Sequence, residues 1–259
     1  MAIVDSFSDN LSLSEKIERA SALEGLIGDY RELPRGERMD RSLATVLHNL
    51  GNIRYLLGEH NEAHQLYQNS MNIFQELGDK SGVSKSLHQL GILAYDKGDL
   101  AEARRLSLES MKIKKELGDK GGVSMSLHQL GMIAQATSDL AEARWLYQDS
   151  MKISQELGDK SGVSMSLHQL GILAYLTGDL AEARRLSLNS MKIKQELGDK
   201  SGIAFSLAQV SLLEEKEGNL EKALELMRQA ESVFMELGSP VSAKAQADRQ
   251  RLEKKIGNS

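Results

Sequence analysis

The sequence predicts an all-α protein made of consecutive helical hairpins, and three observations lead to that prediction. The first is an internal repeat of forty residues, and the second is a Gly-Asp pair that recurs about every twenty residues. The third is composition: aromatic residues make up 4% of the 259 residues and there are two prolines. Few aromatic residues and few prolines argue against a β-sheet protein and favour a chain of helices.

The repeat is carried by the string SLHQLG, which begins at Ser86, Ser126 and Ser166. Diverged copies precede and follow it, as VLHNLG from Val46 and SLAQVS from Ser206. A fixed period of this length is the sequence signature of a repeat architecture. We therefore expect five tandem units, at residues 37–77, 78–117, 118–157, 158–197 and 198–238.

Each unit divides into two helices at its Gly-Asp pairs, for example at Gly98-Asp99 and again at Gly118-Asp119. Glycine tolerates the left-handed conformation that ends a helix. Aspartate can accept hydrogen bonds from the free amides that begin the next one. We therefore expect helices of about 18 residues joined by very short turns into antiparallel pairs.

The first helix of each unit carries a small residue in its middle, although a mid-helix glycine costs about 1 kcal/mol relative to alanine. We expect close backbone packing against the second helix to compensate. The residues concerned are Gly51, Gly91, Gly131 and Gly171 on first helices, and Ala63, Ala103, Ala143, Ala183 and Ala223 on second helices.

Residues 1–36 are expected to hold an amino-terminal segment and a capping helix over residues 14–33, stopped by Pro34. A capping helix is needed because the end of a stack of repeats would otherwise leave an apolar face in water. The face predicted to be buried carries Ile17, Ala20, Leu23, Ile27 and Tyr30.

Residues 239–259 are expected to form the carboxy-terminal capping helix, which extends to about Ile256. Ser239 is predicted to be its N-cap and Pro240 its first helical residue. Polar Gln250-Arg251 stands where the repeats have Leu-Gly, as suits a helix that faces water.

These units resemble the tetratricopeptide repeat. The family's order of an apolar residue, Leu-Gly, a turn, alanine and an aromatic residue is matched in the third unit by Leu127, Leu130, Gly131, Ser138, Asp139, Ala143, Tyr147 and Ser150. The period of forty exceeds the usual 34 and is similar to the longer repeats of kinesin light chains and of the Leu-Gly-Asn-repeat adaptors. Ser107 and Ser187 depart from the pattern by replacing the aromatic residue. The resemblance implies a right-handed α-solenoid of helix-turn-helix repeats with a capping helix at each end.

The resemblance also implies that the first helices line a concave surface, here called the trough, and that a peptide or protein segment binds there. The trough residues expected to bind are His48, Asn49, Asn52, Tyr55, Lys85, His88, Gln89, Ile92, Tyr95, Met125, His128, Gln129, Met132, Gln135, Met165, His168, Gln169, Ile172, Tyr175, Phe205, Gln209 and Leu212. Few of the residues expected on this surface are charged, and an exposed apolar surface usually marks an interaction site. We therefore expect a largely uncharged ligand with apolar anchors.

An amide side chain recurs once in every unit of the trough, at Asn49, Gln89, Gln129, Gln169 and Gln209. An amide both donates and accepts hydrogen bonds, so it could pair with the backbone of an extended peptide of any sequence. The alternative is that glutamine, a good helix former on an exposed face, was copied by duplication without such a role.

The histidines His48, His88, His128 and His168 also recur once per unit, which suggests a metal site. Neighbouring packed helices lie about 8–10 Å apart, whereas each ligand of a zinc ion must come within about 2.1 Å of it. We therefore expect no metal and no cofactor, and we interpret these histidines as polar lining of a trough that could respond to pH.

Charge and motif content exclude several classes of function. The net charge of −5 has the wrong sign for nucleic-acid binding. The lysine-rich stretch at residues 112–116 is interpreted as a solvated helix face. No apolar run approaches the roughly 18 residues needed for a membrane span, residues 1–13 lack the basic start of a secretory signal, and the absence of cysteine fits a reducing compartment.

Enzyme motifs of the phosphate-binding, dinucleotide-binding, zinc-protease and serine-hydrolase types are absent from the sequence. We therefore expect a soluble cytoplasmic protein-binding scaffold that is not an enzyme and is a monomer or a weak homo-oligomer. Two alternatives stay open: a self-assembling structural solenoid, and an allosteric receptor for a short signalling peptide or an apolar small molecule.

Overall fold

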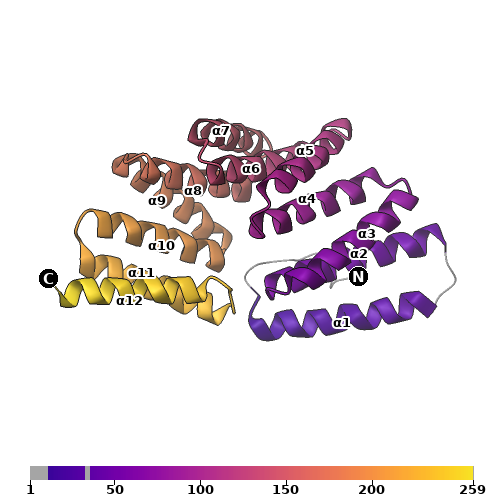
Figure 1. The fold of residues 1–259 in the computed structure, drawn as a ribbon, viewed down its shortest axis with the longest axis horizontal. Helices are drawn as coiled ribbons and strands as arrows, with labels where there is room; N and C mark the ends of the chain where they lie inside the picture. Colours follow the sequence, from indigo (N-terminus) through magenta and orange to yellow (C-terminus); the bar gives the residue numbers. More distant parts are fainter. Residues whose placement is uncertain (1–10, 33–35, 259) are drawn as a thin grey trace. The chain divides into compact units, whose positions relative to one another are not determined.

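The computed structural model describes residues 11–32 and 36–258, and regular structure in that part of the chain is α-helical (Figure 1). The helices are α1 (Leu13–Glu32), α2 (Glu37–Leu56), α3 (His60–Glu76), α4 (Lys80–Asp96), α5 (Leu100–Glu116), α6 (Lys120–Ala136), α7 (Leu140–Glu156), α8 (Lys160–Leu176), α9 (Leu180–Leu197), α10 (Lys200–Lys216), α11 (Leu220–Glu236) and α12 (Ser242–Gly257). The prediction of an all-α chain is confirmed.

The chain divides into two compact units, unit 1 (Met1–Ala143) and unit 2 (Arg144–Ser259), with the boundary inside α7. In unit 1 each helix packs against the next from α1 to α6, and α4 also contacts α6. In unit 2 the same order runs from α8 to α12, and α8 also contacts α10. This sequential packing of helix pairs is that of an α-solenoid. No helix in the described residues is long and apolar enough to cross a membrane.

The turns between helices have the predicted chemistry. At the start of α4, Asp79 Oδ1 accepts a hydrogen bond of 3.0 Å from the amide of Gly82, and six further aspartates cap their helices in the same way. The residue before each of these aspartates has a positive φ, for example 64° at Gly78. Glycine adopts this conformation without strain, so each Gly-Asp pair both ends one helix and begins the next.

Ser138 is the exception, because it is a non-glycine residue with a positive φ of 63° in the turn before α7. A side chain in this conformation brings Cβ too close to the backbone, at a cost of about 1–2 kcal/mol. The corresponding turn one unit later has Gly178, with φ 85°.

The amino-terminal capping helix buries a slightly different face from the one predicted. Ala20, Leu23 and Ile27 are buried as expected, whereas Ile17 is 55% exposed and Lys16 is buried instead. Lys16 lies four positions before Ala20 and seven before Leu23, so it shares their face of the helix. Ile17 is rotated about 100° from Lys16 around the helix axis and therefore leaves that face. The predicted stop at Pro34 lies outside the described residues.

The carboxy-terminal capping helix begins later than predicted. Its N-cap is Val241, and the prediction that Ser239 caps it is wrong. The Ser239 carbonyl instead accepts a hydrogen bond of 3.1 Å from the Ser242 amide, which closes a turn. Proline at the second position of such a turn is favourable because its φ is already fixed, and Pro240 occupies that position.

The interpretation of residues 112–116 as a solvated face is wrong for one residue. Lys112 and Lys115 are exposed, but Lys114 is 3% exposed and its Nζ donates a hydrogen bond of 3.1 Å to Ser126 Oγ. The same register position holds Phe74 in α3, which is 6% exposed. Position 114 therefore faces the interior, and burial lowers the pKa of Lys114 to about 8.

We predict that Ser138→Gly stabilises the protein. Removing the side chain from a left-handed position relieves strain, and after allowance for the greater freedom of glycine in the unfolded chain the gain should be roughly 0.5–1 kcal/mol. Urea unfolding followed by circular dichroism measures the change. The matched control is Gly178→Ser, which should destabilise; a neutral result for both changes would contradict the strain argument.

We also predict that Lys114→Met stabilises the protein at pH 7 by roughly 1–3 kcal/mol, because the buried ammonium group is replaced by an apolar chain of similar length. The folded pKa of Lys114 lies below its unfolded value, so the unfolded chain binds the extra proton between about pH 8 and 10.5. Wild-type stability should therefore rise with pH across that window, and the variant should lose that rise. The exposed control Lys112→Met should change neither property.

Candidate functional site

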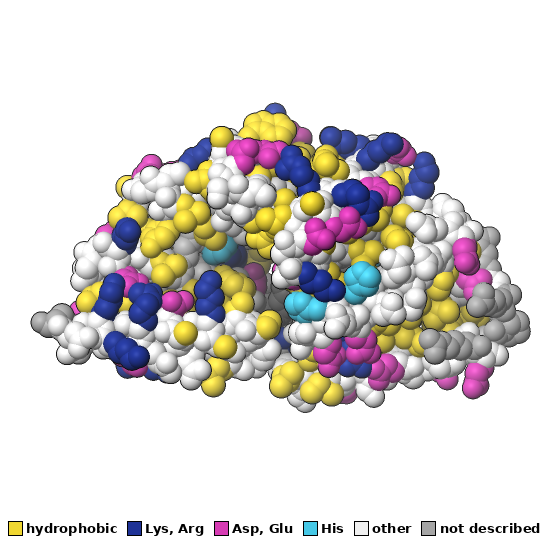
Figure 2. All heavy atoms as spheres, in the orientation of Figure 1, with side chains coloured by type: hydrophobic (Ala, Val, Ile, Leu, Met, Phe, Trp, Pro, Cys, Tyr) yellow, Lys and Arg dark blue, Asp and Glu magenta, His cyan; other side chains and the backbone are white. Residues whose placement is uncertain are grey.

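The predicted trough residues lie on α2, α4 and α6 in unit 1 and on α8 and α10 in unit 2. The most exposed apolar ones are Met125, Met165 and Phe205, which stand at the same register position and are 52%, 43% and 40% exposed. Lys85 occupies this position on α4 and is also exposed. In unit 2, hydrophobic side chains are visible over α8 and α10, whereas lysine and arginine side chains gather over α12 (Figure 2). The first helices therefore present large apolar side chains at a fixed interval.

The remaining predicted trough residues divide into two groups by burial. Half-buried residues, which keep part of their surface accessible, are His48, Asn52, Tyr55, Gln89, Ile92, Tyr95, Met132, Gln135, His168, Gln169, Ile172, Tyr175 and Leu212. Buried residues are Asn49, His88, His128, Gln129 and Gln209. Three of the five predicted amide positions are thus inside the protein, and the amide ladder is not a uniform surface feature.

The amide of Gln129 is buried because it packs over the mid-helix glycine of the preceding 40-residue repeat. A methyl group placed on Gly91 would lie 2.8 Å from Gln129 Nε2 and 3.3 Å from Ser107 Oγ. Gln129 Nε2 also donates a hydrogen bond of 3.4 Å to the carbonyl of His88. The glycine therefore makes room mainly for side chains. Its closest backbone neighbour in the partner helix is the carbonyl oxygen of Ala103, at 3.5 Å from the same methyl position.

In the first 40-residue repeat, a tyrosine ring fills the space over the mid-helix glycine. A methyl group on Gly51 would lie 2.7 Å from the ring of Tyr67, whose hydroxyl donates a hydrogen bond of 2.8 Å to Asn52 Oδ1. Gln89 lies in the repeat after the one that contains Tyr67, and it is half-buried. Gln129 lies in the repeat after the one that contains Ser107, and it is buried. Replacement of the aromatic residue by serine therefore leaves space over the mid-helix glycine, and the glutamine of the following repeat fills it.

The same relation between serine and glutamine is found within unit 2, the second of the two compact units. Gln169 follows Tyr147 and is half-buried, whereas Gln209 follows Ser187 and is 5% exposed. A methyl group on Gly171 would lie 3.0 Å from Gln209 Nε2 and 3.1 Å from Ser187 Oγ. The sequence signal for the buried amides was therefore present in Ser107 and Ser187, but on a different helix from the glutamines themselves.

Of the recurring histidines, His88 and His128 are buried, whereas His48 and His168 are half-buried. Burial lowers the pKa of His48 and of His128 to about 4. For His48 the positive charge of the nearby Lys85 adds a smaller contribution in the same direction. Burial, with a further contribution from Lys114, lowers the pKa of His88 to about 3. These histidines are therefore neutral at pH 7. Among the described residues, no group of three or more His, Cys, Asp or Glu side chains is arranged to hold a metal ion.

Unit 2 contains a cavity of about 350 Å³ that the sequence did not predict. It lies between α8, α10, α11 and α12, and combines predicted trough residues with residues of the capping helix. Its lining consists of His168, Ile172, Tyr175, Leu176, Phe205, Ala208, Gln209, Leu212, Met227, Phe234, Val241, Lys244, Ala245 and Asp248. The ring of Phe205 packs edge-on against that of Phe234 at a centroid distance of 4.9 Å. The cavity is therefore mostly apolar, with few polar groups.

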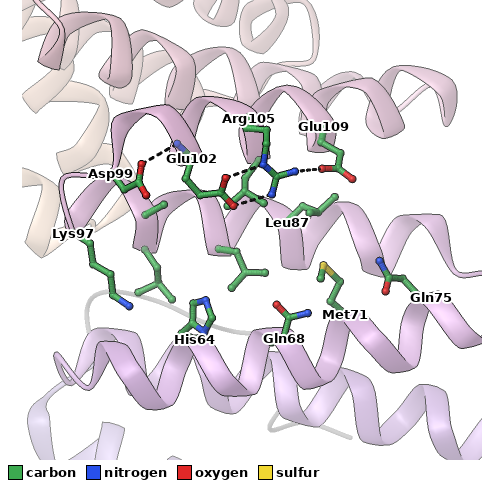
Figure 3. Close-up of a pocket in the computed structure, with 14 residues that line it drawn as sticks. His64, Gln68, Met71, Gln75, Leu87, Lys97, Asp99, Glu102, Arg105 and Glu109 are labelled. Atoms are coloured by element: carbon green, nitrogen blue, oxygen red, sulfur yellow. Dashed lines mark hydrogen bonds and ion pairs between the residues drawn. The ribbon is translucent and has the colours of Figure 1, made fainter.

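Unit 1 contains a second cavity, also of about 350 Å³, between the second helices α3 and α5 (Figure 3). Its floor is made by leucines that include Leu87 of α4, and its rim by polar side chains. On that rim Arg105 forms ion pairs with Glu102 at 2.7 Å and with Glu109 at 3.0 Å. The guanidinium of Arg105 is therefore already engaged by two carboxylates of its own helix.

The arrangement defines a class of protein, one built from tandem helical hairpins joined by Gly-Asp turns. A family profile described as "Tetratricopeptide repeat" matches residues 42–116, 122–196 and 164–236. The chain belongs to the tetratricopeptide-repeat family. No curated protein sequence matches it.

Solved structures share the fold. A crystal structure of BtubC (BKLC) from P. vanneervenii is 19% identical, with a TM-score of 0.65 over 85% of this chain and 91% of that one. The Rap conjugation gene regulator of plasmid pLS20, in complex with the Phr* peptide, is 14% identical, with a TM-score of 0.69 over 95% and 71%. A putative kinesin light chain from Podosopora anserina is 19% identical, with a TM-score of 0.51 over 75% and 95%. At these identities the likeness concerns the fold.

We predict that buried neutral histidines make the protein acid-sensitive. Their folded pKa values lie below the unfolded value of 6.5, so between about pH 6.5 and 4 the unfolded chain binds more protons and stability falls as pH falls. Each histidine can remove up to about 1.4 kcal/mol per pH unit within that window. Urea unfolding at a series of pH values should show this slope, and His88→Asn or His128→Asn should reduce it. A slope that is the same in both variants and the wild type would contradict the assignment.

Proposed function

We propose that this chain is a non-catalytic scaffold whose trough binds a peptide or an extended segment of another protein. The observation that carries this proposal is the exposure of Met125, Met165 and Phe205 at one register position of successive first helices. Large apolar side chains gathered on a surface usually mark an interaction site. Methionine adapts its flexible chain to partners of different shape. Tetratricopeptide repeats are, in general, protein-binding scaffolds, which supports the same assignment.

The charge of the first helices favours a largely uncharged ligand. Glu215, at the end of α10, is paired with Arg251 at 2.8 Å and with Lys255 at 2.7 Å, so its charge is neutralised within the protein. Lys85 and Asp96, both on α4 and both exposed, have opposite signs. With a net charge of −5 on the whole chain, nucleic acid is not the expected partner. Apolar anchors would then supply most of the binding free energy.

Polar contacts to a ligand would come from the accessible amides. Gln89 and Gln169 are half-buried, so their amides can reach a ligand that lies on the surface. Each can donate to a backbone carbonyl and accept from a backbone amide. Tyr95 and Tyr175, also half-buried on the same helices, add a ring with a polar tip. This mixture suits recognition of an extended chain by its backbone and by a few apolar side chains.

Similarity of fold to proteins solved with peptides supports the proposal. The Rap regulator of pLS20 was crystallised with the Phr* peptide, and a second Rap protein with Competence and Sporulation Factor. The second is 11% identical to this chain, with a TM-score of 0.68 over 95% of this chain and 72% of that one. We propose that this chain likewise binds a peptide of its own, in the cytoplasm.

The proposal predicts that charge placed in the trough weakens binding. Peptides selected from a random-peptide display library against the full chain would serve as probes, with affinity measured by fluorescence anisotropy. Met165→Glu should weaken binding roughly tenfold or more, because its carboxylate must be desolvated against an apolar ligand.

Met235→Glu is the matched control. Met235 is 65% exposed but lies on α11, a second helix, so this change adds the same charge away from the trough. It should leave affinity unchanged. Equal effects of the control and the trough variant, no effect of the trough variant, or failure to select any peptide would overturn the proposed function.

A further inference from the structure

Helix α4, the first helix of the second 40-residue repeat, carries a charged residue at each end of its predicted trough face. Lys85 and Asp96 are both exposed, and the half-buried residues Gln89 and Ile92 lie between them. The four residues are spaced at i, i+4, i+7 and i+11, so they form one line along the helix, here called the α4 stripe. At a rise of 1.5 Å per residue, the backbone positions of Lys85 and Asp96 are about 16 Å apart. The α4 stripe therefore has a cation at one end, an anion at the other and no charge between them.

The equivalent stripes of the other repeats lack this pair of charges. In place of Lys85 they have Thr45, Met125, Met165 and Phe205, and in place of Asp96 they have Leu56, Ala136, Leu176 and Lys216. The fourth repeat gives the closest comparison, because residues 79–118 and 159–198 differ at five positions, two of which are the ends of this stripe. Helix α8 therefore carries an uncharged copy of the same surface.

Neither charge of the α4 stripe is neutralised by the part of the chain that the structure describes. Within those residues Lys85 and Asp96 form no hydrogen bond and no ion pair. Burial is the main reason that the pKa values of His48 and Lys114 are low, and the positive charge of Lys85 lowers both further. Burial raises the pKa of Tyr95, and the negative charge of Asp96 raises it further. The neighbours on which these two charges act are thus groups that cannot compensate them.

Lys97 follows Asp96 in the sequence but lies on another side of α4. Figure 3 shows Lys97 reaching from the end of α4 toward His64, in the groove between α3 and α5. The pKa of His64 is lowered by burial and, to a smaller extent, by the charge of Lys97. Successive residues of a helix point about 100° apart, so Lys97 does not belong to the stripe that Asp96 ends.

We propose that a peptide bound to unit 1 lies along α4 in an extended conformation, with an acidic residue at Lys85 and a basic residue at Asp96. The proposal rests on the proposed function, because it names the charges that the trough selects in its ligand. An extended chain rises about 3.3 Å per residue, so a distance of about 16 Å corresponds to a spacing of about five residues between the two ligand charges. These charges cancel, which agrees with a ligand of little net charge.

The middle of the α4 stripe suits the backbone between the two ligand charges. The half-buried amide of Gln89 can donate to one backbone carbonyl and accept from one backbone amide. The ion pairs at the two ends would be exposed to water, and each is therefore worth only about two- to fivefold in affinity. Their main effect is to fix the register and the direction of the peptide on the helix.

The first experiment compares the peptides that two forms of the full chain select from one random-peptide library. Wild type should enrich peptides that have an acidic and a basic residue about five positions apart. Lys85→Met combined with Asp96→Leu gives α4 the stripe of α8, and it should fold because the fourth repeat already has these residues. This variant should not enrich the charge pair. Equal enrichment by both forms, or no enrichment by wild type, would overturn the inference.

The second experiment exchanges the two charges while it keeps the net charge of the chain. Lys85→Glu combined with Asp96→Lys should weaken binding of a peptide selected on wild type roughly tenfold, because two attractions become two repulsions. A peptide with its acidic and basic residues exchanged should recover most of this loss in the variant and should bind wild type more weakly. The recovery isolates the pairwise interaction. All peptides have acetylated and amidated ends, so no terminal charge contributes.

A single substitution at the neighbouring lysine is the matched control. Lys97→Glu and Lys85→Glu change the net charge equally, but Lys97 lies in the groove between α3 and α5. Lys85→Glu should weaken binding severalfold, and Lys97→Glu should have little effect. Circular dichroism checks that each variant folds. Equal losses in the two variants would show that only the overall charge matters, and would overturn the inference.

The outcomes separate this inference from the proposed function. Peptides that lose affinity in Met165→Glu but bind equally well to wild type and to the charge-exchanged variant would leave the trough as a peptide-binding surface and overturn the role of Lys85 and Asp96. Peptides that are insensitive to Met165→Glu and to the exchange would overturn the proposed function as well.

Discussion

The turn formed by a left-handed glycine and a capping aspartate is the constraint on which the rest of this structure depends. At Gly78-Asp79 the positive φ ends one helix, and Asp79 Oδ1 accepts from the Gly82 amide to begin the next. Repetition of this turn gives helices of nearly constant length, so a given register position meets the same kind of neighbour in each unit. Outward-facing Met165 and Phe205 recur on α8 and α10 for that reason, as does the small residue in the middle of each first helix.

Because the register is the same in each repeat, single substitutions are enough to give the repeats different interiors. Tyr67 fills the space over Gly51, whereas Ser107 leaves the space over Gly91 to Gln129 of the following unit. Ala208, at the register position of the recurring histidines, lines the cavity of unit 2. Repeats that share one register therefore differ in which of their amides are accessible.

Electrostatics separates the two cavities. The groove between α3 and α5 has a rim on which Arg105 is already paired with Glu102 and Glu109. The cavity of unit 2 has a mostly apolar lining whose charged residues are Lys244 and Asp248, and Asp248 is paired with Arg251 at 3.3 Å.

The sequence by itself determined the repeat and the ends of nearly all helices, because these depend on local spacing and on the chemistry of glycine and aspartate. It did not determine that Lys114 is buried while Lys112 is exposed, that Ile17 faces water, or that Gln129 and Gln209 lie inside. Only the tertiary structure decided these, because burial depends on which side chain of a neighbouring helix already fills the space. Periodicity within one helix contains no information about that neighbour.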